Sequence, residues 1–334
     1  MISGMDVLVM GAGLVGCYVG GKCAQGNAQV TFVGRPQHMT NIRERGLTLT
    51  DVEGGRFHLP GSVVRVATEL NRGLKPDVVL LTVKSSATAT AAAQLAKYMP
   101  SGTQVICFQN GVNNLEIARR HAPNLDIVAG MVPFNIIELG PGCFHQTTRG
   151  ALWAQAGPSA ERIATALASA QMPFHVSADM KRVLWSKLLL NLNNPVGAVS
   201  GKPLLEQLLD RGYRVCLAAL IDEALLAMFR SGIQPVPLTT IPLRWFPSIL
   251  RLPTPLYKSF ARKMLRIDPR ARTSMAADLE RGRPTEISEL CGAVVQLAQA
   301  VGTPSPVNTS MLQIVEGWDG IYLTSSDLKS ALNI

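Results

Sequence analysis

The feature that most constrains this 334-residue chain is a glycine turn near its amino end. Gly11-Ala12-Gly13-Leu14-Val15-Gly16 follows the apolar run 7–10 directly and opens a helical pattern over 14–25. In this context the first glycine permits a tight turn, the second lets a pyrophosphate approach the backbone, and the third lets the helix pack closely on a strand. The turn therefore predicts a dinucleotide site at residues 11–16, and its alternative is a glycine turn that binds nothing.

Strand and helix patterns alternate through the first half of the chain. Apolar runs at 7–10, 30–33, 78–83, 105–108 and 127–132 are separated by helical patterns at 14–25, 87–98 and 115–121. This alternation is typical of βαβ units and a mostly parallel sheet. From residue 183 onward strand signals nearly vanish and helical spacing takes over. We expect an α/β Rossmann-type domain at 1–180 that binds NADP, and an all-α domain at 181–334 that carries the substrate and catalytic residues.

The residue that ends the second strand indicates the cofactor. Enzymes that use NAD carry Asp or Glu here to bind the ribose 2′-hydroxyl, whereas this chain has Arg35. A guanidinium can pair with a 2′-phosphate through two hydrogen bonds. The sequence therefore favours NADP(H), and the alternative is an arginine that only faces solvent.

Two further polar residues follow strands at the edge where ligands of open α/β sheets bind. Lys84 follows the run 78–83, and Asn110 stands in Gln109-Asn110-Gly111 after the run 105–108. We expect Lys84 to contact cofactor ribose or phosphate, and Asn110 to contact the nicotinamide ribose or the substrate. The alternatives are a solvated lysine and a plain Asn-Gly turn.

Polar side chains in the second half indicate a cleft. Lys187 and Asn191 are four residues apart on one face of a Leu-rich helix, and Asn194 follows near that face. Such groups are costly to bury without partners, so they line a cleft or bond to one another in the core. Ser274 and Glu286 come later, and Glu286 has an alternative role at a helix start capped by Thr285.

Composition excludes several other classes of protein. Hydrophobic residues make up 47% and charged residues 16%, which suits folded cores rather than a disordered chain. The six cysteines form no C-x-x-C pair, so we expect neither a disulfide framework nor a metal site. The amino end lacks a basic region and a cleavage site, and no apolar stretch reaches about 18 residues. We expect a cytoplasmic protein without a signal peptide or membrane span.

The net charge of +9 is concentrated in residues 233–272. That segment has a local net charge of +7 from Arg244, Arg251, Lys258, Arg262, Lys263, Arg266, Arg270 and Arg272 against Asp268. Seven prolines predict short helices and turns there. A basic charge is typical of proteins that bind nucleic acid, but the sequence lacks zinc-finger, RNP-like and helix-turn-helix signatures. A solvated basic face is favoured, and the alternative is a membrane or partner surface carrying Trp245, Phe246, Tyr257 and Phe260.

Taken together, these strings resemble the ketopantoate reductase (2-dehydropantoate 2-reductase) family from Gly11 to about Asn308. The resemblance is carried by Gly11-Ala12-Gly13 with Gly16, Arg35, Val83-Lys84, Gln109-Asn110-Gly111, Trp185-Ser186-Lys187 with Asn191, Ser274-Met275 with Asp278, and Thr285-Glu286-Ile287. It implies reduction of 2-dehydropantoate to (R)-pantoate by NADPH, a step of pantothenate and coenzyme A biosynthesis. The partner is then a small 2-oxo acid. We expect no binding of nucleic acid or membrane, and the sequence leaves the oligomeric state open, with a homodimer as one possibility.

The resemblance also implies a role for each site residue. Lys187 is the general acid at the carbonyl, and Glu286 orients substrate and lysine. Ser274 binds the substrate carboxylate, Asn191 and Asn194 hold its hydroxyl end, and Asn110 bridges cofactor and substrate.

One departure leaves the substrate open. Family members often space two asparagines four apart after the lysine, but position 195 is proline and no asparagine follows Asn194 before Asn308. The alternatives are a reductase of another branched 2-oxo acid and a non-catalytic NADP(H)-binding sensor.

Overall fold

Strand β1 (Asp6–Met10) shows why the first part of the chain folds around a sheet with two buried faces. Val7 and Val9 pack into one hydrophobic core, whereas Leu8 and Met10 pack into another. Successive side chains of a strand point to opposite faces, so an uninterrupted apolar run buries both faces at once. The apolar runs of the sequence therefore mark strands at the centre of the sheet.

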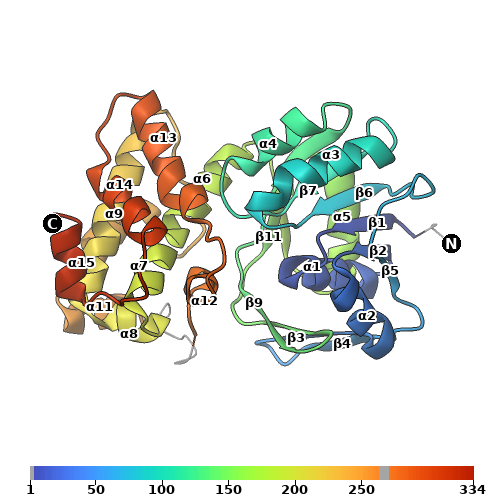
Figure 1. Cartoon of the computed structure of the whole chain (residues 1–334), viewed down its shortest axis with the longest axis horizontal. Coiled ribbons are helices and arrows are strands. Elements are labelled where there is room, and N and C mark those ends of the chain that lie inside the picture. The colour runs from blue at the N-terminus through green and yellow to red at the C-terminus, as the bar shows by residue number, and fades with distance from the viewer. Residues whose placement is uncertain (1–3, 263–270) are drawn as a thin grey trace. The chain divides into compact units, whose positions relative to one another are not determined.

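The computed structural model describes residues 4–262 and 271–334. It consists of two units, Met1–Met180 and Lys181–Ile334 (Figure 1). Each unit is described on its own below.

The main sheet of the first unit is mostly parallel, as predicted. Its strand order is β12 (Phe174–Ser177), β11 (Leu152–Gln155), β8 (Asp126–Met131), β7 (Gln104–Cys107), β6 (Val78–Leu81), β1, β2 (Gln29–Val33), β5 (Arg65–Ala67). Neighbouring strands pair in parallel except β8 and β11, which are antiparallel. The carboxyl ends of β1, β2, β6 and β7 therefore meet at one edge, where the glycine turn begins.

A second sheet covers helix α1 (Leu14–Gln25), and the sequence did not predict it. Its order is β4 (Arg56–Leu59), β3 (Leu47–Asp51), β10 (Cys143–Gln146), β9 (Ile136–Gly140). Leu47, Leu49 and Phe144 of this sheet share the hydrophobic core of α1. Figure 1 shows β3 and β4 on the side of α1 away from β1. Gly21 of α1 permits this packing, since a Cβ there would lie 2.8 Å from the side chains of Leu47 and Leu49. Gly20 permits the close approach of α1 to Val9 and Phe32 of the main sheet.

Helices cover both faces of the main sheet. Helices α1 and α5 (Pro158–Ser169) pack on one face, and α3 (Thr88–Tyr98) and α4 (Asn114–His121) on the other. Helix α2 (Pro36–Arg45) follows β2, and a short 3₁₀ turn, η1 (Ser85–Ala87), precedes α3. This layered arrangement is the Rossmann-type fold that the alternating pattern predicted.

The described part of the second unit is helical, as predicted. Its elements are α6 (Met180–Asn191), α7 (Asn193–Ser200), α8 (Leu204–Leu209), α9 (Arg211–Arg230), η2 (Leu243–Trp245), α10 (Phe246–Arg251), α11 (Thr254–Phe260), α12 (Ser274–Glu280), the π-helical turn η3 (Ser288–Gly292), α13 (Ala293–Ala300), α14 (Pro306–Glu316) and α15 (Ser325–Ala331). The long helix α9 packs against α7, α8, α10, α13, α14 and α15. The carboxylate of Glu223 in α9 accepts 2.8 Å bonds from the backbone N–H groups of Val307 and Asn308, which fixes the start of α14.

The basic segment consists of short helices, as its prolines predicted, but its aromatic residues do not share one surface. Trp245 and Phe260 are more than half exposed, whereas Phe246 and Tyr257 are buried. Tyr257 packs against the buried guanidinium of Arg214, 4.1 Å from its ring centre. The four aromatics therefore do not form the interface considered above. Lys263, Arg266, Asp268 and Arg270 lie outside the described residues.

Part of the segment's charge is balanced by acids from neighbouring helices. Arg251 forms an ion pair of 2.6 Å with Asp222 of α9, and Arg272 pairs with Glu280 of α12. Across residues 4–262 and 271–334, every helix is too short or too polar to cross a lipid bilayer.

Candidate active site

The glycine turn lies where β1, β2 and β6 end. The N–H groups of Gly11 and Ala12 both bond to the carbonyl of Val33 at the end of β2, at 3.0 and 2.9 Å. The hydroxyl of Thr82 donates a 2.8 Å bond to the carbonyl of Gly11. Gly11 has φ +104°, a conformation that favours glycine. The turn is thus anchored on both sides before α1 begins.

The other two glycines of the turn differ in what surrounds them. A Cβ on Gly16 would collide with the Gly11 carbonyl and lie 2.5 Å from the Thr82 hydroxyl. A Cβ on Gly13 would meet no atom within 4 Å. The first helical bond of α1 runs from the N–H of Cys17 to the carbonyl of Gly13. The first N–H groups of a helix have no acceptor within that helix, so a helix start with open space beside Gly13 suits a pyrophosphate.

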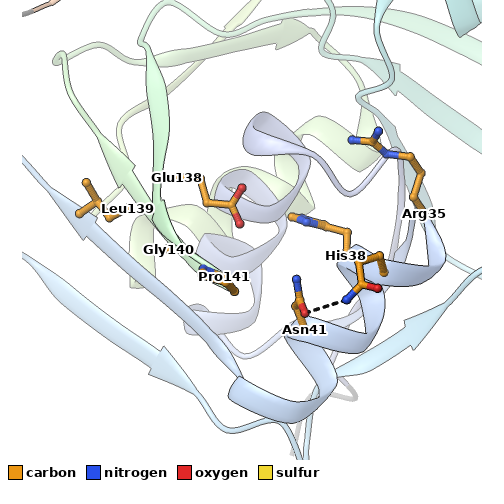
Figure 2. Close-up of a pocket in the computed structure, with 8 residues that line it drawn as sticks. Arg35, His38, Asn41, Glu138, Leu139, Gly140 and Pro141 are labelled. Carbon is orange, nitrogen blue, oxygen red and sulfur yellow. Dashed lines mark hydrogen bonds between the residues drawn. The ribbon is translucent and has the colours of Figure 1, made fainter.

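Arg35 lines a cavity that has a volume of about 600 Å³ (Figure 2). The cavity lies between the first turns of α2 and the β9–β10 hairpin and is lined by Arg35, Gln37, His38, Asn41, Glu138, Leu139, Gly140 and Pro141. Arg35 is exposed and directly precedes α2. A guanidinium at the end of β2 beside an open cavity fits the 2′-phosphate end of NADP(H).

Residues after β6 and β7 form one hydrogen-bonded network. The side-chain amide of Gln109 donates to the carbonyl of Val83 at 2.9 Å and to the hydroxyl of Thr88 at 2.6 Å. The side-chain amide of Asn114 donates to the carbonyl of Asn110. Lys84 is exposed and begins the turn η1. Lys84 and Asn110 therefore lie at the carboxyl edge of the sheet, as predicted.

Lys187 lies on α6 in the second unit, and its side chain is partly buried. Burial lowers the pKa of Lys187 from 10.5 to about 8, because a charged ammonium loses its hydration there. The neighbouring Ser186 is fully buried and accepts a 2.8 Å bond from the N–H of Val236. This bond fixes α6 to the segment that follows α9.

Asn191 and Asn194 belong to different helices, which corrects the single helix face assumed from their spacing. Asn191 ends α6 and is buried, whereas Asn194 stands in the first turn of α7. Leu192 separates the two helices, so Asn194 does not belong to the helix that carries Lys187.

A small pocket in the second unit gathers two of the predicted substrate-binding residues and one predicted catalytic residue, Glu286. It is lined by Asn194, Ser274, Met275, Asp278, Glu286 and Leu290. Its volume is about 10 Å³, near that of one water molecule, so it marks where these side chains converge rather than enclosing a substrate. Lys187 and Asn191 do not line it. Glu286 precedes η3, and Thr285 does not stand at the cap position of that turn.

Sequence reasoning missed Glu138, His38 and Thr273. Glu138 and His38 line the cavity of Arg35, and Thr273 donates a 3.2 Å bond to the carbonyl of Asn194. No local sequence motif marks Glu138 or His38 as a site residue. Glu138 lies near α2 only because β9 belongs to the second sheet. Thr273 directly precedes Ser274 and could have been singled out as a helix cap.

Comparison with known proteins identifies relatives along most of the chain. The sequence model described as "Ketopantoate reductase PanE/ApbA" matches residues 7–159, and its C-terminal counterpart matches 179–318. The 2-dehydropantoate 2-reductase of Halobacterium salinarum is 27% identical over 331 residues, covering 93% of this chain and 98% of the relative.

Solved structures agree with these matches. A PanE/ApbA family ketopantoate reductase from Ralstonia eutropha has a TM-score of 0.79 at 26% identity, covering 99% of this chain and all of the other. A D-mandelate dehydrogenase bound to NADH and anilino(oxo)acetate shares the fold, with a TM-score of 0.76 at 18% identity over 99% of this chain and all of the other.

Proposed function

The chain belongs to the ketopantoate reductase family, and we propose that it reduces 2-dehydropantoate to (R)-pantoate with NADPH. It is an oxidoreductase that acts on a carbonyl or the corresponding alcohol. The substrate, the choice of NADPH, the roles of individual residues and the place in pantothenate and coenzyme A biosynthesis are the proposed part.

The observation that carries the proposal is the convergence of Asn194, Ser274 and Glu286 on one pocket. These residues come from α7, α12 and the segment before η3, and the resemblance had assigned all three to the substrate. A hydroxyl and an amide can hold a carboxylate and a hydroxyl group, and a carboxylate can orient an ammonium. Their meeting supports a site for a small polar acid.

Lys187 is the proposed general acid. When bound, NADPH supplies the hydride. Hydride addition to the carbonyl carbon leaves negative charge on the carbonyl oxygen, and the Lys187 ammonium gives a proton to that oxygen. Its pKa of about 8 suits this task, since the group is mostly protonated at neutral pH and releases a proton readily. Glu286 and Asn191 are positioning residues for the lysine and the substrate.

The cofactor half of the proposal is supported by residues of the first unit. The open space beside Gly13 and the helix start of α1 suit a pyrophosphate, and Arg35 suits a 2′-phosphate. Lys84 is proposed to contact a ribose or phosphate of the cofactor, and Asn110 the nicotinamide ribose or the substrate. The D-mandelate dehydrogenase with the same fold binds NADH, so cofactor choice needs a direct measurement.

The decisive experiment follows NADPH oxidation with a panel of branched 2-oxo acids that includes 2-dehydropantoate. The proposal expects the highest kcat/KM with 2-dehydropantoate and a strong preference for NADPH over NADH. A higher kcat/KM with another branched 2-oxo acid would replace the substrate. Tight NADPH binding without turnover of any 2-oxo acid would favour the non-catalytic sensor. The homodimer and the cytoplasmic location stay predictions.

A further inference from the structure

Glu138 lines the same cavity as Arg35, although it comes from strand β9 of the second sheet. Figure 2 shows the Glu138 carboxylate and the His38 ring directed toward one another across the cavity, with Arg35 at another edge. The carboxylate that NAD enzymes carry at the end of β2 is absent from that position, but a carboxylate faces the same space from a distant part of the chain. Arg35 is therefore not the only charge that a ligand in this cavity meets.

The charge of Glu138 affects a buried side chain next to the cavity, the Cys17 thiol. Burial raises the pKa of the Cys17 thiol, and the nearby carboxylate of Glu138 raises it further. The Nε2 atom of His38 lies 3.7 Å from the Cys17 sulfur, and its ring packs edge-on against Phe144, 5.8 Å between ring centres. His38 therefore contacts both α1 and the second sheet, and it lines the same cavity as Arg35 and Glu138.

We propose that Glu138 is a specificity-determining residue that reduces the preference for a 2′-phosphorylated cofactor. The inference rests on the proposed use of NADP(H). Arg35 attracts a 2′-phosphate, whereas a carboxylate in the same cavity repels it. A 2′-hydroxyl is uncharged and can donate a hydrogen bond to a carboxylate. Arg35 and Glu138 therefore have opposite effects on the affinity for a 2′-phosphate. The preference for NADP(H) over NAD(H) is then smaller than Arg35 alone would give.

Nucleotide fragments test this inference without catalysis. Adenosine 2′,5′-bisphosphate and adenosine 5′-monophosphate differ only in the 2′-phosphate, and calorimetry gives a Kd for each. In Glu138→Gln the bisphosphate should bind roughly 3- to 10-fold more tightly, as expected for removing one like charge from a partly solvated site. Binding of the monophosphate should stay the same or weaken. The gain should shrink at high salt, where exposed charges are screened.

Glu44→Gln is the matched control. Glu44 is exposed on the same helix α2 and does not line the cavity, yet its substitution changes the net charge equally. An equal gain in both variants would overturn the inference, because it would reflect net charge alone. An unchanged Kd for the bisphosphate in Glu138→Gln would overturn it as well, while leaving the cofactor assignment intact.

The same measurements distinguish a failure of the NADP(H) assignment from a failure of the role proposed for Glu138. Wild-type protein that binds the monophosphate as tightly as the bisphosphate would remove the NADP(H) assignment and this inference together. Wild-type protein that prefers the bisphosphate, with Glu138→Gln preferring it more, supports both.

Discussion

The side-chain hydroxyl of Thr273 donates a hydrogen bond of 3.2 Å to the backbone carbonyl of Asn194. Thr273 is buried and precedes α12, while Asn194 lies in the first turn of α7, so this bond joins the starts of the two helices. Gly197 permits the close approach, since a Cβ there would lie 2.6 Å from the Thr273 methyl carbon. The contact brings Ser274 and Asn194 to the same pocket.

Replacing Thr273 by Val should therefore loosen the proposed substrate pocket without changing side-chain shape. We expect the KM for the 2-oxo acid to rise about 3- to 10-fold and the free energy of unfolding to fall by about 1 kcal/mol, the usual net worth of one hydrogen bond. The Kd of NADPH should not change. Thr309→Val is the control, because the Thr309 hydroxyl bonds to Ser305 within α14. A KM that rises equally in both variants would contradict the special role of Thr273.

Gly13→Ala and Gly16→Ala should separate cofactor binding from folding. Gly13 has φ −95° and open space for a Cβ, so Gly13→Ala should fold normally and bind NADPH at least tenfold more weakly by occupying the space for the pyrophosphate. In Gly16→Ala the collision with Gly11 should lower Tm. Fluorescence titration and calorimetric melting distinguish the two effects. Normal NADPH affinity in Gly13→Ala would place the pyrophosphate elsewhere.

Arg35→Ala should weaken NADPH far more than NADH. A charge-assisted hydrogen bond contributes roughly 1.5–3 kcal/mol, so the Kd of NADPH should rise about 10- to 100-fold. The Kd of NADH should change little, because Arg35 would meet only a hydroxyl there. Equal losses for both cofactors would show that Arg35 does not recognise the 2′-phosphate.

Lys187→Ala should lower kcat by roughly 10²- to 10⁴-fold, the usual contribution of general acid catalysis. NADPH affinity should be nearly unchanged, since the proposed cofactor-binding residues belong to the first unit. Glu286→Ala should also lower kcat/KM, and the double variant should lose less than the two single losses combined if the residues act together. A Lys187→Ala protein that melts early but keeps its kcat would overturn the mechanism.

The pH dependence should follow the lowered pKa of Lys187. Reduction needs the protonated amine, so kcat/KM should fall as pH rises through about 8. Stability should change in the opposite direction. The unfolded lysine, with a pKa of 10.5, binds more protons than the folded one between pH 8 and 10.5, so wild type should gain stability relative to Lys187→Met over that range. Parallel pH profiles of kcat/KM and Tm check both signs.

Local sequence patterns determined the Rossmann-type unit and its glycine turn. The run at 7–10 is apolar throughout because both faces of β1 are buried, and the glycines that follow are required by a tight turn and a close helix contact. The limits of α1 match the predicted 14–25. The described strands all end before residue 183, where the sequence pattern changes from strands to helices. These features are readable because each depends on neighbours along the chain.

Only the tertiary structure decided the second sheet and the side chains that meet in each site. Strands such as β4, Arg56–Leu59, are short and half exposed, so they lack a strong apolar pattern. Glu138 reaches the cavity of Arg35 through the pairing of β9, and Asn194 reaches Ser274 through packing of α7 on α12. Such meetings depend on contacts between distant segments, and a linear sequence records which side chains are present but not which ones packing brings together.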